Sequence, residues 1–160
     1  MNLCTRTEHC LTEYTTVSPE ETRALGERLA GKLSRGSVIA LKGGLGAGKT
    51  CLVKGIARGL GITESVTSPT YTIISEYNVR LGEQTVPLYH IDAYRLNGDE
   101  DFENTGAGEL IGGKEGRGMG IIEWSERIPR SIPPHAITIE IEITGPQSRL
   151  FRVYDEPACH

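Results

Sequence analysis

Apolar positions in the first sixty residues predict a strand, a helix, a second strand and a second helix. Residues 11–17 (LTEYTTV) are rich in β-branched side chains, which favours a strand. Apolar residues then recur at helical spacing from Leu25 to Leu33, and the polar run at 34–36 ends that helix. The short apolar run at 37–41 (SVIAL) is typical of a strand buried on both faces. The second helix is expected over residues 50–60.

Three residues mark the start of the first helix. Ser18 suits the N-cap and Pro19 suits the first helical position. Glu21 occupies the capping-box position, from which its carboxylate can bind a backbone N–H at the helix start. The helix is therefore expected to begin at Pro19.

The rest of the chain is predicted to contain more strands than helices. Strands are expected over residues 71–79, 86–92, 119–123, 136–143 and 150–154. Residues 80–83 (RLGE) predict a hairpin turn, and residues 99–110 have a weak helical pattern. Because hairpins are mixed with one strand–loop–helix crossover, we predict an α/β fold with a mixed sheet flanked by helices.

Composition narrows the class of protein. The chain has 160 residues, 38% hydrophobic and 24% charged, which fits a single domain over residues 1–160 with frayed ends at 1–10 and 156–160. A formal charge of −4 disfavours binding of a nucleic acid through its phosphates alone. There is no apolar run of membrane-spanning length and no signal-peptide core, and the four cysteines form no C-x-x-C pair. We therefore expect a cytoplasmic protein without membrane contact.

The segment at 43–50 (GGLGAGKT) matches the pattern G-x-x-x-x-G-K-[ST] between a predicted strand and a predicted helix. Its glycines let successive backbone N–H groups surround a phosphate, and the positive end of the helix adds to the same place. Lys49 is expected to reach the β- and γ-phosphates, and the Thr50 hydroxyl to bind Mg²⁺. The residues expected to bind the nucleotide are Gly44, Leu45, Gly46, Ala47, Gly48, Lys49 and Thr50. The motif predicts a P-loop NTPase-like fold that binds a nucleoside triphosphate.

Phosphoryl transfer also needs carboxylates, and two of them end predicted strands. Asp92 and Glu123 stand where ligands gather in α/β sheets. One of them would bind the metal and the other would lie near the attacking water, or each would cap a turn. His90 shares a strand face with Asp92, but without a third ligand at zinc spacing a hydrogen-bonding or packing role is favoured. Cys51 is expected to be buried as a small apolar group.

Four sequence blocks belong together: residues 43–50 (GGLGAGKT), 68–77 (SPTYTIISEY), 90–96 (HIDAYRL) and 121–129 (IIEWSERIP). In this order they resemble the TsaE family, small bacterial ATPases that support threonylcarbamoyladenosine modification of tRNA. The likeness spans about residues 12–154. It implies an ATPase that uses ATP and Mg²⁺. It also implies partner proteins, TsaB and TsaD, with tRNA reached indirectly while ATP turnover resets TsaD.

The resemblance also implies roles for single residues. Thr50 and Glu123 would bind Mg²⁺, Asp92 would be the essential acid, and Thr70 would sense the γ-phosphate. Trp124 would pack beside the nucleotide, although a core role is equally consistent with its sequence position. The predicted catalytic residues are Lys49, Thr70, Asp92 and Glu123.

Some features of the predicted site stay open. An arginine approaches the nucleotide in the family; Arg149 is the best match and Arg152 the alternative, while the strand and turn at 11–19 are expected to line the purine. Since no arginine finger is identifiable, hydrolysis by the chain alone is expected to be slow until a partner completes the site. The alternatives are a small-molecule kinase, with the glycine-rich segment 106–120 and its Arg117 as a lid, and a switch that binds ATP without hydrolysis.

Overall fold

Strands dominate the computed structural model, which describes residues 10–67, 73–111 and 118–155. The strands are β1 (Cys10–Thr16), β2 (Val38–Lys42), β3 (Ile74–Leu81), β4 (Gln84–Asp92), β5 (Met119–Glu123), β6 (Ile137–Ile143) and β7 (Arg149–Asp155). The helices are α1 (Pro19–Ala30), α2 (Lys49–Gly59) and α3 (Asp99–Asn104), with short 3₁₀ turns η1 (Ala107–Glu109) and η2 (Ser125–Arg127). In these described ranges no helix has the length and apolar character needed to span a membrane.

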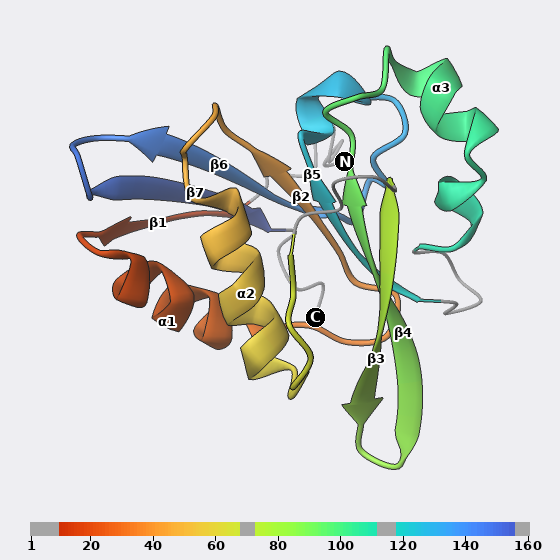
Figure 1. The fold of residues 1–160 in the computed structure, drawn as a ribbon, viewed down its shortest axis with the longest axis horizontal. Coiled ribbons are helices and arrows are strands. Elements are labelled where there is room, and N and C mark those ends of the chain that lie inside the picture. Colours follow the sequence, from red (N-terminus) through yellow and green to blue (C-terminus); the bar gives the residue numbers. More distant parts are fainter. Residues whose placement is uncertain (1–9, 68–72, 112–117, 156–160) are drawn as a thin grey trace, which may run out of the picture.

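The described strands form one sheet in the order β1-β7-β6-β2-β5-β4-β3 (Figure 1). The pairs β6–β2, β2–β5 and β5–β4 are parallel. The pairs β1–β7, β7–β6 and β4–β3 are antiparallel. Figure 1 shows α1 and α2 together on one side of the sheet and α3 on the other. The predicted α/β fold with a mixed sheet flanked by helices is confirmed.

Strand alternation sends side chains into two separate cores. Leu88, Met119 and Ile121 pack in the core shared with α1 and α2. Their neighbours Ile91 and Ile122 pack with α3 and η1 in the other core. All of β5 and the first four residues of β2 are buried, as expected for central strands covered on both faces.

Capping at the start of α1 follows the predicted pattern with one difference. The Oγ of Ser18 accepts a hydrogen bond from the backbone N–H of Glu21 at 3.1 Å. The Glu21 carboxylate accepts one from the N–H of Val17 at 2.6 Å, one residue earlier than the reciprocal bond of a capping box. Pro19 occupies the first helical position, as predicted.

The helix predicted over residues 99–110 is interrupted after α3. The Thr105 hydroxyl donates to the carbonyl of Phe102 at 2.6 Å, and its oxygen accepts from the backbone N–H of Ala107 at 3.1 Å. These local bonds compete with the next helical turn and separate α3 from η1. The strand predicted from residue 71 is observed from Ile74, and residues 71 and 72 lie outside the described ranges.

Candidate functional site

Glycine conformations shape the loop between β2 and α2. Gly46 and Gly48 have φ angles of +76° and +100°, in the left-handed region that residues with a Cβ rarely adopt. Gly48 is also the N-cap of α2, and it makes no side-chain hydrogen bond there. The backbone N–H groups of the first turn of α2 therefore suit an external acceptor such as an anion.

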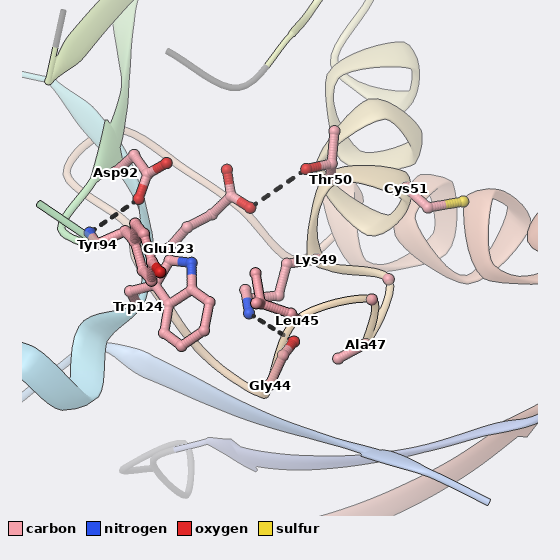
Figure 2. A pocket seen from close by; sticks show the side chains of 12 residues that line it. Gly44, Leu45, Ala47, Lys49, Thr50, Cys51, Asp92, Tyr94, Glu123 and Trp124 are labelled. Atoms are coloured by element: carbon pink, nitrogen blue, oxygen red, sulfur yellow. Dashed lines mark hydrogen bonds between the residues drawn. The ribbon is translucent and has the colours of Figure 1, made fainter. Parts of the chain in front are cut away.

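The loop lines a cavity of about 400 Å³ at the ends of β2, β4 and β5 (Figure 2). The lining residues are Gly44, Leu45, Gly46, Ala47, Gly48, Lys49, Thr50, Cys51, Asp92, Tyr94, Glu123 and Trp124. The cavity thus brings the loop residues singled out from the sequence into one space with both strand-end acids.

The ammonium group of Lys49 is held by the loop and by an aromatic ring. Nζ donates to the carbonyls of Gly43 and Gly44, the latter at 3.0 Å. It also lies 3.7 Å from the centroid of the Trp124 ring, a cation–π contact. Burial lowers the pKa of Lys49, and nearby carboxylates act in the opposite direction. A bound anion would favour the charged form that burial disfavours.

The two acids are neighbours because β4 and β5 are parallel and in register. Asp92 pairs with Glu123 at the ends of these strands. Glu123 Oε1 accepts a hydrogen bond from Thr50 Oγ1 at 3.4 Å, which joins β5 to the start of α2. Asp92 Oδ1 accepts one from the backbone N–H of Tyr94 at 2.9 Å. Asp92 therefore stabilises a turn and also lines the cavity.

His90 contacts Glu123 from the neighbouring strand. Its Nε2 lies 2.6 Å from Glu123 Oε2, and the two side chains are 1% and 3% exposed. In the part of the chain that the structure describes, no group of three or more His, Cys, Asp or Glu is placed to hold a metal ion. The distance between His90 and Glu123 therefore fits the hydrogen-bonding role favoured for His90.

The oxygen donors at the cavity fit Mg²⁺ bound together with a phosphate ligand. Mg²⁺ usually takes one or two protein oxygens and completes its shell with phosphate and water. The Thr50 hydroxyl and the Glu123 carboxylate lie close together beside the phosphate-type loop, which satisfies this requirement. The donor set is therefore compatible with a metal that arrives with a nucleotide.

Trp124 has a strained backbone that aims its ring at the site. Its φ of +58° is the only positive value among the described non-glycine residues. The next residue fixes this turn, because Ser125 Oγ donates to the carbonyl of Leu41 at 3.0 Å while fully buried. The Trp124 ring packs on Tyr94 with centroids 4.9 Å apart, and it also touches the core beside α3. The core and site roles weighed for Trp124 thus coexist.

The two candidate arginines lie on different sides of β7. Arg149 and Phe151 are two residues apart in β7, so they lie on the same face of the strand, and Phe151 packs in the core shared with α2. Its guanidinium donates to the carbonyls of Gly46 and Ala47 at 3.0 and 3.2 Å. Arg152 instead pairs with Glu142 at 2.9 Å on the opposite face. Of the two, Arg149 is the residue placed at the loop.

A second cavity of about 290 Å³ adjoins the first through Gly48 and Cys51. Its other lining residues are Pro19, Thr22, Pro146, Gln147 and Arg149. The half-buried thiol of Cys51 donates to the carbonyl of Pro19 at 3.2 Å. This cavity is lined by Pro19, which belongs to the turn that the resemblance implies for the purine.

Not every predicted residue joins the site. Thr70 and Arg117 lie outside the described residues. Ala107 and Ile111, from the start of the glycine-rich segment, pack in the core on the face opposite α1 and α2. Because residues 112–117 of this segment lie outside the described residues, the lid with Arg117 stays a prediction.

Sequence reasoning missed Arg127 and Ser125. The Arg127 guanidinium lies 5.0 Å from the Tyr94 ring centroid and 5.9 Å from that of Trp124. Residues three apart lie on the same side of a helical turn, so Arg127 lies on the side of Trp124. This relation can be inferred from the sequence only if a helical turn is assumed at η2. Nothing in the sequence indicated the bond of Ser125 to β2, because its acceptor is a distant carbonyl.

Comparisons with known proteins agree on one family. The model of the family described as "Threonylcarbamoyl adenosine biosynthesis protein TsaE" matches residues 16–151. A tRNA threonylcarbamoyladenosine biosynthesis protein TsaE from Treponema pallidum is 42% identical over 132 residues, covering 82% of this chain and 92% of that protein. One of the same name from Bacillus subtilis is 41% identical over 137 residues, covering 86% and 81%.

A third relative and a solved structure extend the likeness. The TsaE protein of Aquifex aeolicus is 38% identical over 146 residues, covering 90% of this chain and 96% of that protein. The crystal structure of Bacillus subtilis YdiB superposes with a TM-score of 0.70 at 34% identity, covering 93% of this chain and 88% of that one. The similarity therefore extends over the sheet, the loop and the strand-end acids.

Proposed function

Because this chain belongs to the TsaE family of threonylcarbamoyl adenosine biosynthesis proteins, we propose that it binds ATP with Mg²⁺ and hydrolyses the γ-phosphate. The family name ties it to threonylcarbamoyladenosine modification of tRNA. We propose TsaB and TsaD as its protein partners, with tRNA reached through them.

The observation that best supports this function is the single cavity shared by the loop and the two acids. Lys49 and Thr50 line it from α2, and Asp92 and Glu123 line it from β4 and β5. A glycine-rich loop by itself only binds phosphate, whereas phosphoryl transfer also needs groups for the metal and for the nucleophile. Their proximity favours an ATPase over a simple anion site.

In the proposed mechanism the chain chiefly positions reactants. Lys49 and the backbone N–H groups of the loop bind the β- and γ-phosphates, with Lys49 leaving its present carbonyl partners. Thr50 and Glu123 would hold Mg²⁺, which neutralises phosphate charge when bound. Asp92 orients a water for in-line attack. The oxygen of this water bonds to the γ-phosphorus as the bond from that phosphorus to the β,γ-bridging oxygen breaks, which releases ADP, and the proton of the water leaves with the inorganic phosphate.

Hydrolysis by the chain alone is expected to be slow. The Arg149 guanidinium donates to four backbone carbonyls, those of Gly46, Ala47, Gly145 and Ser148. Engaged in this way, it braces the loop, and it is not among the residues that line the cavity shared by the loop and the two acids. We propose that docking of TsaB and TsaD completes the site with a cation for the transferring phosphate, so the rate of phosphate release should rise when both are added. An unchanged rate at saturating partner would count against this.

Two substitutions test the assignment of roles. Lys49→Ala should lose measurable ATP binding in isothermal titration calorimetry, because the phosphates lose their cation. Asp92→Ala should bind Mg·ATP nearly as well as the unaltered protein, yet release phosphate roughly a hundredfold more slowly or worse, because water is no longer oriented.

Lys54→Ala is the matched control, since Lys54 is an exposed lysine on the same helix that lines a different cavity. It should bind and hydrolyse ATP like the unaltered protein. Normal turnover by the Asp92 variant would remove that residue from the mechanism, and tight ATP binding by the Lys49 variant would contradict the proposed phosphate site.

A further inference from the structure

A histidine is buried against the carboxylate that the proposed function assigns to the metal. His90 Nε2 lies 2.6 Å from Glu123 Oε2, and both side chains are almost completely buried. The pairing crosses two parallel strands: His90 is opposite Ile121, so Glu123 lies one step further along the same face. That face is the one covered by α2, where Ile121 packs.

The second ring nitrogen of His90, Nδ1, makes no hydrogen bond to the described residues, so the polar contact of the imidazole is the one from Nε2 to Glu123. His90 Nδ1 is buried and has no hydrogen-bond partner among the described residues. A buried polar group without a partner costs free energy that an apolar side chain of similar size would avoid. If His90 only filled the core, a leucine or methionine would do so without this cost, so the contact with Glu123 is what distinguishes a histidine here.

The two oxygens of Glu123 point to different partners. Oε2 faces His90, whereas Oε1 faces the Thr50 hydroxyl at 3.4 Å (Figure 2 shows the latter bond). A hydrogen bond to one oxygen fixes the rotation of a carboxylate, and with it the direction of the other oxygen. An imidazole that donates from Nε2 to Glu123 can keep Nδ1 as an acceptor, so that no buried N–H donor is left unpaired.

We propose that His90 is a positioning residue, which orients the Glu123 carboxylate so that Oε1 stays beside Thr50 as a ligand for the divalent cation. This proposal rests on the proposed function, because it presumes that a metal binds with the nucleotide. His90 itself touches neither metal nor nucleotide. Its effect is expected in metal affinity, with little effect on nucleotide affinity in the absence of metal.

The test compares amide side chains of two lengths at position 90. In His90→Gln the amide nitrogen is as many bonds from the backbone as Nε2 and can donate to Glu123. In His90→Asn the amide ends at the distance of Nδ1 and cannot reach. His90→Leu removes all polarity, and His135→Leu removes a histidine bonded to the carbonyl of Gly36, away from the cavity, as a control.

The readout is Mn²⁺ binding followed by electron paramagnetic resonance of the free ion, in the presence of saturating ADP. ADP affinity in EDTA and the melting temperature are measured on the same samples. His90→Asn and His90→Leu should need about tenfold more Mn²⁺ or worse for half-saturation, as for other residues that orient metal ligands. His90→Gln and His135→Leu should stay near the unaltered protein, and ADP affinity in EDTA should hardly change.

A His90→Gln protein that binds Mn²⁺ no better than His90→Asn, for any reason including failure to fold, overturns the positioning role. So does a His90→Leu protein with unaltered Mn²⁺ affinity. If the unaltered protein binds ADP without taking up Mn²⁺, the proposed magnesium chemistry fails and this proposal fails with it. If the unaltered protein takes up Mn²⁺ and the Gln variant does not recover it, only the role of His90 is lost.

Discussion

At the scale of single residues, the loop is held in shape by side chains that bind its backbone. Arg149 donates to the carbonyls of Gly46 and Ala47, and Lys49 donates to those of Gly43 and Gly44. These bonds hold the loop backbone in one conformation, and the start of α2 has no side-chain cap, so its first N–H groups suit an anion. The arginine thus prepares the loop before any phosphate binds.

Arg149→Ala should therefore weaken ATP binding even though Arg149 need not touch the phosphates. Loss of several charge-assisted bonds to the loop should cost about 1–3 kcal/mol, or roughly 5- to 150-fold in the dissociation constant measured by calorimetry. Arg152→Ala is the control, because Arg152 pairs with Glu142 and Glu13 on the other face of the sheet. Equal affinities for the two variants would show that the loop needs no brace.

Single residues also mark the limit of what the sequence could predict. The loop motif identified Lys49 and Thr50 because their roles depend on spacing within one short segment. The contact of His90 with Glu123 joins residues 33 positions apart, and it depends on which strands pair and in what register. Period-two alternation placed His90 beside Asp92 but could not indicate its partner on the next strand.

At the scale of elements, close packing of α1 on α2 fixes the helix that carries the loop. Two glycines make this approach possible: a Cβ on Gly55 would lie 2.2 Å from the carbonyl oxygen of Arg23, and one on Gly26 would lie 2.5 Å from that of Leu52. The helices touch backbone to backbone, so α2 cannot shift without moving α1. This contact also holds Pro19 against Cys51 at the edge of the site.

Gly55→Ala should destabilise the protein by about 1–3 kcal/mol, because one methyl group must force two helix backbones apart. Gly31→Ala is a matched control at the end of α1, where φ is −64° and the nearest contact of a Cβ is 3.4 Å. It should change stability by less than about 1 kcal/mol. Urea denaturation followed by circular dichroism measures both, and equal stability of the two variants would contradict the packing argument.

Most elements were predictable because each is defined by local patterns. The buried run at 37–41, the capping of α1 and the late hairpin all correspond to observed elements within a residue or two. The helix predicted over 99–110 was wrong beyond Asn104, since the Thr105 side chain competes with the helical backbone bonds. Such competition depends on side-chain geometry that hydrophobic periodicity does not contain.

At the scale of the whole molecule, the sheet order explains why the site lies where it does. The parallel strands β2, β5 and β4 are adjacent, so the loop after β2 and the acids that end β5 and β4 meet at one edge. Strands β6, β7 and β1 extend the sheet on one side, with β6 parallel to β2 and β7 antiparallel to both β6 and β1. From there β7 brings Arg149 to the loop. The sequence indicated a mixed sheet, but its strand order depends on contacts between distant segments.

Hydrogen–deuterium exchange with and without Mg·ADP tests the central claim most directly, because that claim concerns backbone N–H groups. Peptides covering residues 43–52 should exchange more slowly when Mg·ADP is bound, and those covering 119–124 should gain protection only when the metal is present. The peptide over α3, on the opposite face of the sheet, should not change. Unaltered exchange at 43–52 together with protection elsewhere would contradict the account.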